Sequence, residues 1–366
     1  MKILITGTHF TPALATIEEL KKYRVTQIVY VGRKTTKEGD SSRSIESRII
    51  PEYGVKFRPI IAGRFQRYFS IYTILSLLKL PIGFIQSFFI LLKEKPDVVL
   101  SFGGYISVPV VFWGWMFSVP IIVHEQTLVT GLATKISLIF ADKIAISFPE
   151  SKLSKNPKSI LTGNPIRQEI LDNSLGVNLP HPRGVVNRHL RIPTVLITGG
   201  NQGSHVINLA VEECLGELLK IANLIHQTGD SKYKDFERLI NLENKKYKVY
   251  KWIDDIGDII KGADLIVSRA GIVTLSELAY LGKPALVVPI PYLYKNEQEK
   301  NARYFEKIGL VKILSQTKLN GENLLKSVKS CLDNLEVLNK NAQKAKQVII
   351  PDGSKRLALE TILLSK

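Results

Sequence analysis

The order of apolar and polar residues predicts strands that alternate with helices along most of the chain. Short apolar runs, typical of parallel strands buried on both faces, are followed by longer stretches with helical spacing. This alternation indicates an α/β fold with doubly wound parallel sheets. The strands predicted for the first half are residues 2–6, 27–32, 55–61, 97–102, 120–124 and 142–147.

A second series of the same kind follows, with predicted strands at residues 194–198, 223–227, 248–250, 264–267 and 283–289. Two such series predict two Rossmann-like domains, because 366 residues are too many for one ordinary core. Open parallel sheets bind ligands at the carboxyl ends of their strands, so we expect these ends to face a shared cleft. The expected division is a first domain at 1–167, a linker at 168–192, a second domain at 193–350, and a closing helix at 351–366 that packs back on the first domain.

Residues 64–95 depart from this alternation, because they are first basic and then almost wholly apolar. The apolar part is long enough for a membrane span. However, Pro81 divides it, and a span would interrupt the sheet between its third and fourth strands. We therefore predict two helices that lie partly in the core and partly on an anionic membrane surface; an ordinary pair of core helices is the alternative. The expected cationic rim is Arg58, Arg64, Arg67, Lys79, Lys93 and Lys95.

Composition narrows the class of partner. Hydrophobic residues make up 45% of the chain, which excludes wholesale disorder, and the formal charge of +17 favours nucleic acid, acidic lipid or phosphorylated substrates. Cys214 and Cys331 lie far apart, so neither a disulfide framework nor a zinc site is predicted, and a reducing cytoplasm is expected. Met1 and Lys2 lead directly into the first predicted strand, so we expect no signal segment.

Residues 263–277 predict a nucleotide site, because a buried strand is followed by a sharp turn at Gly271 and a helix start near Thr274. The unpaired N–H groups and the positive dipole end of such a helix favour a pyrophosphate. Glu277, one turn further along, can accept hydrogen bonds from a ribose diol. The alternative is that Ser268, Thr274 and Ser276 merely cap a core helix.

Two further patterns give weaker evidence for a ligand site. The turn at residues 199–203, Gly-Gly-x-Gln-Gly, is compatible with phosphate but matches neither a dinucleotide fingerprint nor a P-loop. Asp254 and Asp255 could hold a metal through their carboxylates, although such a pair more often caps a helix.

Seven motifs, taken together and in this order, resemble the MurG family of peripheral membrane glycosyltransferases. Members of that family move N-acetylglucosamine from UDP to the lipid-linked muramyl-pentapeptide precursor of peptidoglycan. The resemblance covers roughly residues 2–364 and implies a two-domain GT-B fold. The motifs are Gly103-Gly104-Tyr105-x-Ser107-x-Pro109, His124-Glu125-Gln126, Gly163-Asn164-Pro165-Ile166-Arg167, Gly199-Gly200-x-Gln202-Gly203, Ile253-Asp254-Asp255, Ser268-Arg269-x-Gly271-x-x-Thr274-x-Ser276-Glu277 and Gln298-x-x-Asn301-Ala302.

The resemblance implies that the second domain binds UDP-N-acetylglucosamine. Glu277 would bind the ribose hydroxyls, and Ile253 and Arg167 would lie near the uracil. The diphosphate would be held by the turn at Asn201 and Gln202 and by the helix start from Gly271 to Thr274. Gln298 and Asn301 would reach the sugar.

The first domain would take the acceptor, undecaprenyl-diphospho-N-acetylmuramyl-pentapeptide, at the cytoplasmic face of the cell membrane. His9 matches the family's candidate general base, and its near-neutral intrinsic pKa suits removal of a proton from the acceptor's 4-hydroxyl. Glu125 is the second catalytic candidate, although acceptor binding is its expected role. No cofactor is required, and Mg²⁺ is a possible counter-ion of the diphosphate. The implied acceptor-binding residues are Thr8, Gly104, Tyr105, His124, Gln126 and Thr127.

Four positions depart from the family pattern: the turn at Gly7 to His9 is about two residues short, Thr127 replaces an Asn, Asn201 replaces a Ser, and Glu297 replaces a Gln. Three other functions remain as alternatives. A glycolipid synthase with a diacylglycerol acceptor would share the mechanism, and a UDP-sugar 2-epimerase would share the fold without needing an apolar, basic segment. A non-enzymatic sugar-nucleotide or nucleic-acid binding protein would leave His9, Glu125 and Glu277 idle. RNA-binding aromatic signatures are absent from the sequence, so no nucleic-acid partner is expected.

Overall fold

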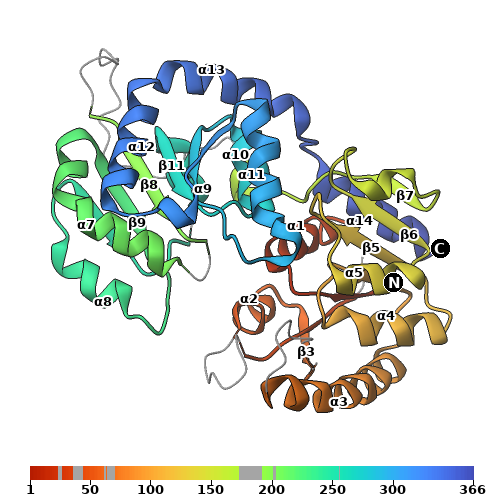
Figure 1. The fold of residues 1–366 in the computed structure, drawn as a ribbon. Helices are drawn as coiled ribbons and strands as arrows, with labels where there is room; N and C mark the ends of the chain where they lie inside the picture. Colours follow the sequence, from red (N-terminus) through yellow and green to blue (C-terminus); the bar gives the residue numbers. More distant parts are fainter. Residues whose placement is uncertain are drawn as a thin grey trace. The chain divides into compact units, whose positions relative to one another are not determined.

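The chain forms two compact units, each built around its own parallel sheet (Figure 1). The first unit comprises residues 1–168 and 350–366, and the second comprises residues 169–349. The computed structural model describes residues 1–23, 27–35, 44–61, 63, 71–172, 192–200, 203–254 and 256–366, with the backbone alone for residues 71–78.

The sheet of the first unit has seven strands within the described residues, in the order β3-β2-β1-β4-β5-β6-β7. The central strand is held on both sides, since Ile5 of β1 pairs with Tyr30 of β2 and with Leu100 of β4. The order reverses between β1 and β4, and ligands of open α/β sheets bind at such a point. The strands are β1 (Lys2–Thr6), β2 (Gln27–Gly32), β3 (Lys56–Pro59), β4 (Val98–Ser101), β5 (Ile121–Glu125), β6 (Lys143–Ile146) and β7 (Ser159–Leu161).

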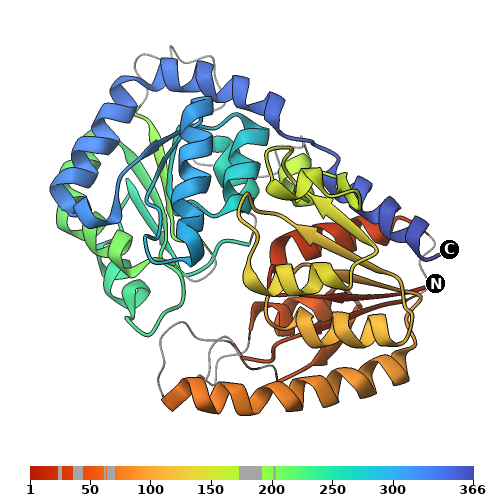
Figure 2. The same cartoon turned by 45° about the vertical axis from the view of Figure 1, so that its right-hand side comes forward.

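Helices cover both faces of this sheet, which explains why its strands are apolar on both sides. One face packs against α1 (Phe10–Leu20), α2 (Ile45–Glu52) and α14 (Gly353–Leu364). The other face packs against α3 (Ile71–Glu94), α4 (Ser107–Met116) and α5 (Leu132–Ile139). Figure 2 shows α14, at the end of the chain, returning to the first unit, where it lies beside α1.

The prediction of two helices separated at Pro81 is wrong, because α3 is one helix with Pro81 inside it. A proline within a helix removes one backbone hydrogen bond and costs about 3 kcal/mol. Packing after the proline offsets this cost: Leu91 is buried, and Trp113 Nε1 of α4 donates to the Phe84 carbonyl at 2.8 Å. No helix in the described parts of the chain is long and apolar enough to cross a membrane.

The second unit repeats the plan with six strands within the described residues, in the order β10-β9-β8-β11-β12-β13. Its main core lies between the sheet and α7, α8, α12 and α13, while α10 and α11 lie on the other side (Figure 1). The strands are β8 (Thr194–Thr198), β9 (Asn223–Gln227), β10 (Tyr247–Tyr250), β11 (Leu265–Ser268), β12 (Ala285–Val287) and β13 (Val311–Ile313). The helices are α7 (His205–Ile221), α8 (Asp235–Leu239), α9 (Ile256–Gly262), α10 (Ile272–Leu281), α11 (Glu297–Ile308), α12 (Gly321–Asp333) and α13 (Leu335–Ala345), with α6 (Gln168–Leu171) at the junction of the units.

Residues 321–345 form two helices, α12 and α13, rather than one continuous helix. They meet at Asn334, whose backbone leaves the helical region at φ −109° and ψ 21°. The Asn334 side chain donates to the Ser330 carbonyl at 2.8 Å, so it satisfies a backbone group at the end of α12. The break allows α12 to pack on α7 while α13 contacts α10 and α11.

Candidate functional site

Two loops meet at the carboxyl ends of β1 and β4 in the first unit. The Thr8 amide donates to the Gly103 carbonyl at 3.1 Å. A Cβ on Gly104 would lie 2.1 Å from Thr8 Oγ1, and the φ of +83° also favours glycine, so this close approach depends on Gly104. The structure therefore brings four of the predicted residues together at this edge: Thr8, His9, Gly104 and Tyr105.

His9 occupies the N-cap position of α1 without capping it, because its side chain makes no hydrogen bond to the helix. Burial and the positive charge of Arg33 lower the pKa of His9 to about 4. The sequence alone indicated a near-neutral value, so the structure corrects the expected pKa downwards. A ring with this pKa is neutral at pH 7, which leaves it able to accept a proton from a substrate hydroxyl.

Residues 124 and 125 end β5, and residues 126 and 127 follow it. All four are buried inside the first unit, at 0–4% exposure. His124 Nε2 lies 3.4 Å from the Gly163 carbonyl and 3.2 Å from Ser147 Oγ, and burial lowers the pKa of His124 to about 4. Glu125 Oε1 accepts a hydrogen bond from the Thr127 amide at 3.0 Å.

The Thr127 hydroxyl lies 2.7 Å from the same oxygen, Glu125 Oε1. The threonine at the family's Asn position thus binds Glu125. A direct role of His124, Glu125, Gln126 or Thr127 in binding or catalysis stays a prediction.

In the second unit, a short turn joins β11 to the start of α10, and the N-cap residue of α10 makes no side-chain hydrogen bond to the helix. Gly271 is the N-cap and has no side chain, and the hydroxyls of Ser268 and Ser276 donate instead to the carbonyls of Arg269, at 3.1 Å, and Ile272, at 2.8 Å. The alternative reading of Ser268 as a cap is therefore wrong, because its hydroxyl bonds to the Arg269 carbonyl. The first N–H groups of α10, which include that of the half-buried Thr274, suit an anion.

The glycine turn before α7 makes a second helix start of this kind. Ser204, its N-cap, makes no side-chain hydrogen bond to the helix. A Cβ on Gly203 would lie 1.8 Å from the Thr228 carbonyl oxygen, so the turn packs directly on the loop after β9. The predicted diphosphate residues Asn201 and Gln202 lie outside the described residues, as does Asp255 of the acidic pair.

Two further predicted donor residues, Glu277 and Ile253, lie in the second unit. Glu277 on α10 is 2% exposed. Ile253, after β10, is half-buried, and its amide donates to Gln227 Oε1 at 3.1 Å. Arg167 is half-buried and belongs to the first unit, whereas Ile253 belongs to the second, so the predicted place of Arg167 near the uracil stays a prediction.

Gln298 and Asn301 on α11 brace the backbone of neighbouring loops. Gln298 Oε1 accepts from the Ile290 amide at 3.0 Å, and Asn301 Nδ2 lies 3.4 Å from the Ala270 carbonyl. Asn301 is fully buried, so in this structure it supports the turn before α10. Its predicted contact with the sugar stays a prediction.

Arg269 is a site residue that the sequence analysis quoted within a motif without giving it a role. Its guanidinium donates to the Val288 carbonyl at 2.9 Å and to Gln316 Oε1 at 2.8 Å. Burial lowers its pKa to about 10, so the side chain is still protonated at pH 7. A half-buried positive charge therefore lies at the carboxyl ends of β11 and β12, close in sequence to the start of α10.

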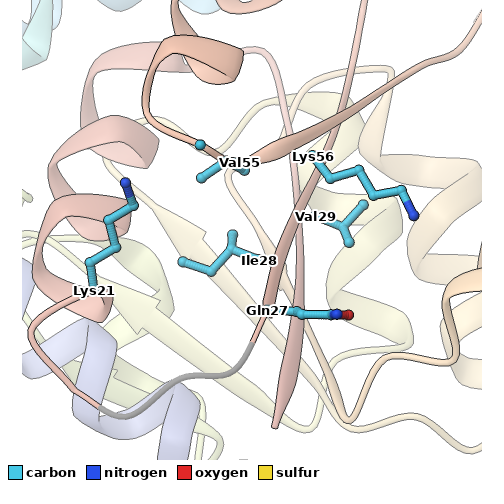
Figure 3. Close-up of a pocket in the computed structure, with 7 residues that line it drawn as sticks. Lys21, Gln27, Ile28, Val29, Val55 and Lys56 are labelled. Atoms are coloured by element: carbon cyan, nitrogen blue, oxygen red, sulfur yellow. The ribbon is translucent and has the colours of Figure 1, made fainter.

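A small open cavity of about 280 Å³ in the first unit is not part of this chemistry. It lies at the amino ends of β2 and β3, opposite the ligand-binding edge of the sheet (Figure 3). Its two lysines are engaged, since Lys21 Nζ donates to the Tyr53 carbonyl and Lys56 Nζ pairs with Glu94 at 2.9 Å.

Both units match one glycosyltransferase family. The glycosyltransferase family 28 N-terminal domain matches residues 5–146, and the family 28 C-terminal domain matches residues 194–357. The structure is also similar to MurG of Acinetobacter baumannii, with a TM-score of 0.71 and 22% identity over 99% of both chains. The UDP-GlcNAc 2-epimerase of Neisseria meningitidis has a TM-score of 0.63 at 17% identity, over 99% of this chain and 100% of that one. At these identities the likeness shows the fold alone. Fold and family matches together define an enzyme of the glycosyltransferase class with a GT-B fold.

Curated relatives narrow the class. A protein of Clostridium botulinum (strain Kyoto / Type A2) is 36% identical over 355 residues, covering 94% of this chain and 95% of the relative. A protein of Halothermothrix orenii is 35% identical over 359 residues, covering 94% and 92%. Both bear the name UDP-N-acetylglucosamine–N-acetylmuramyl-(pentapeptide) pyrophosphoryl-undecaprenol N-acetylglucosamine transferase, and the chain belongs to this family.

Proposed function

We propose that the protein transfers N-acetylglucosamine from UDP-N-acetylglucosamine to the 4-hydroxyl of undecaprenyl-diphospho-N-acetylmuramyl-pentapeptide, a step of peptidoglycan synthesis. The observation that carries this proposal is the 36% identity, over 94% of the chain, to a relative named for that reaction. The carboxyl ends of the two sheets supply groups that suit it.

The second unit would hold the donor and stabilise its leaving group. When the bond between the anomeric carbon and the diphosphate breaks, negative charge develops on the diphosphate oxygens. The N-terminal N–H groups of α10 and α7 can hydrogen-bond this charge, and the helix dipoles favour it. In this proposal Mg²⁺ would accompany the diphosphate as a counter-ion.

The first unit would activate the acceptor through His9. The neutral ring accepts the proton of the 4-hydroxyl while that oxygen attacks the anomeric carbon. A new glycosidic bond forms as UDP leaves from the opposite side, so a single displacement inverts the configuration. His9 afterwards releases its proton to solvent.

The test is a transfer assay with purified protein, UDP-N-acetylglucosamine and a short-chain lipid-linked muramyl-pentapeptide, and the expected product is the lipid-linked disaccharide. A parallel reaction with diacylglycerol tests the glycolipid synthase alternative. A third reaction without acceptor tests for the 2-epimerised UDP-sugar. Product in either parallel reaction, with none from the muramyl acceptor, would overturn the proposal.

We also propose that the first unit works on a membrane surface, at the cytoplasmic face. Large apolar side chains are exposed along three neighbouring helices that pack on one face of the first sheet. An apolar surface of this kind on one side of a unit is typical of an interaction site. The exposed residues are Ile82, Ile85, Phe89 and Leu92 on α3, Trp115 and Met116 on α4, and Leu132, Ile136 and Ile139 on α5.

This apolar face is wider than the sequence analysis expected, because it continues beyond residue 95 onto α4 and α5. Lys93 and Lys95 are exposed near it, and Lys135 adds a charge that was not anticipated. Arg58, which was expected in the cationic rim, forms an ion pair with the buried carboxylate of Glu94 at 2.7 Å. Arg64 and Arg67 lie outside the described residues.

A further inference from the structure

Gln227, the last residue of β9, lies between the two segments proposed for opposite ends of the nucleotide. It pairs in register with Thr198 at the end of β8 and with Tyr250 at the end of β10. The strand β8 leads into the glycine turn for the diphosphate, and β10 leads into the segment at Ile253 for the uracil. The side chain of Gln227 is 2% exposed.

The amide of Gln227 makes contacts in both directions. Its Oε1 accepts a hydrogen bond from the Ile253 amide at 3.1 Å. Its Nε2 lies 3.4 Å from the Gly200 carbonyl and 3.4 Å from Thr198 Oγ1, one acceptor for each of its two N–H groups. Thr198 Oγ1 in turn accepts from the Gly200 amide at 3.1 Å. One buried side chain therefore links residue 200 to residue 253.

The following residue, Thr228, strengthens this link through the backbone. Its amide donates to the Tyr250 carbonyl at 2.9 Å, and its own carbonyl accepts from Asn208 Nδ2 of α7 at 3.0 Å. The same carbonyl oxygen is the atom on which Gly203 packs. The end of β9 thus fixes the glycine turn, the start of α7 and the segment after β10 relative to one another.

We propose that Gln227 is a positioning residue for the donor, which couples the uracil segment to the diphosphate turn. It acts through Ile253 and Gly200 and need not touch the ligand. Because the amide is buried, water cannot readily replace it, and the loss of one partner would leave the other without a hydrogen bond. The inference deepens the proposed function, since it rests on the use of a UDP-sugar by this unit.

Two substitutions separate the two halves of the link. Gln227→Met keeps the length of the side chain and removes both polar groups. Gln227→Glu keeps an oxygen for the Ile253 amide but removes the N–H donors to Gly200 and Thr198. Gln343→Met is the matched control, because it removes a side-chain bond to a backbone carbonyl, that of Gly282 at 3.1 Å, elsewhere in the same unit.

Calorimetry with uridine and UDP measures the effect of each substitution. Gln227→Met should weaken UDP binding about tenfold and uridine binding as well, since both segments lose their restraint. Gln227→Glu should weaken UDP about tenfold while uridine stays within about twofold. In the transfer assay, the KM for the donor should rise more than kcat falls. Gln343→Met should leave all of these values unchanged, and melting curves without ligand check that each variant folds.

The inference is overturned if the unchanged protein binds UDP and a folded Gln227→Met variant binds it equally well, or no worse than Gln343→Met does. It is also overturned if Gln227→Glu weakens uridine and UDP by the same factor, because the link to the diphosphate turn would then have no separate effect. In these cases the proposed function stands. Absence of UDP binding by the unchanged protein would instead overturn the proposed function, and the inference with it.

Discussion

The two units place different chemistry at the same edge of similar sheets. In the first unit, the loop after β1 carries His9, which is neutral because burial and Arg33 hold its pKa at about 4. In the second unit, β11 leads into a helix start at Gly271, close to the half-buried cation Arg269 and the buried carboxylate Glu277. Under the proposed function, the same architecture would supply a proton acceptor in one unit and an anion-binding site in the other.

The largest expected effect is that of removing the proton acceptor from the first unit. His9→Ala should lower kcat by about 10²–10⁴-fold, the usual contribution of general base catalysis, with the KM for the donor within about twofold. Steady-state kinetics with the muramyl acceptor measures both values. UDP affinity by calorimetry is the control for the second unit and should not change. A variant that keeps most of its kcat would show that another group takes the proton.

Substitution of Glu277 tests whether the second unit binds the ribose of the donor. Because its side chain is 2% exposed, Glu277→Gln is preferable to Glu277→Ala, which would leave a cavity. The loss of hydrogen bonds from a charged acceptor, worth about 1.5–3 kcal/mol, should weaken UDP binding roughly 10–100-fold. UDP and its 2′,3′-dideoxy analogue should then bind the variant about equally well in calorimetry. If removal of the ribose hydroxyls weakens binding to the variant as much as to the unchanged protein, Glu277 does not bind them.

Sequence patterns predicted the bounds of the strands more accurately than the pKa values and hydrogen bonds of the side chains. The bounds of β1, β2, β8 and β9 match the apolar runs residue by residue, because strands buried on both faces must be apolar throughout. The continuity of α3 through Pro81 was missed, since the packing of α4 on its second half decides it.

Tertiary contacts also decide the chemistry of single residues. The pKa of His9 depends on its burial and on Arg33, which lies beyond the next strand, and a sequence motif contains no such information. In the same way, the role of Gln227 follows from the register of β8, β9 and β10, which brings Gly200 and Ile253 to one side chain. The motifs therefore predicted the candidate site, while its electrostatics and its internal links required coordinates.

We expect the first unit, but not the second, to bind membranes through its surface. A pair of single substitutions, one in each unit, can measure this difference. Ile139 on α5 is 72% exposed within the apolar face, and Val337 on α13 is 59% exposed in the second unit. Burying one such aliphatic side chain is worth about 1.5–3 kcal/mol, so Ile139→Ser should weaken partition onto anionic vesicles by about tenfold or more. Val337→Ser should have no effect. Co-sedimentation at low and high salt measures both, and equal behaviour of the two variants would contradict a membrane-binding face on the first unit.

The smallest expected effect is the response of the proton acceptor to mild acid. Only the neutral ring of His9 can act as a base, so activity falls as pH drops through its pKa. With the pKa lowered to about 4, His9 is still almost wholly neutral at pH 6. The pH dependence of kcat/KM reports the ionisable groups of the free enzyme, so kcat/KM should change by less than about twofold between pH 8 and pH 6. An ordinary histidine with a pKa of about 6.5 would instead lose about fourfold over this range. Arg33→Gln removes the nearby positive charge and should move the acid limb of the profile towards higher pH. A fourfold loss by pH 6 in the unchanged protein would show that burial and Arg33 do not hold the ring neutral.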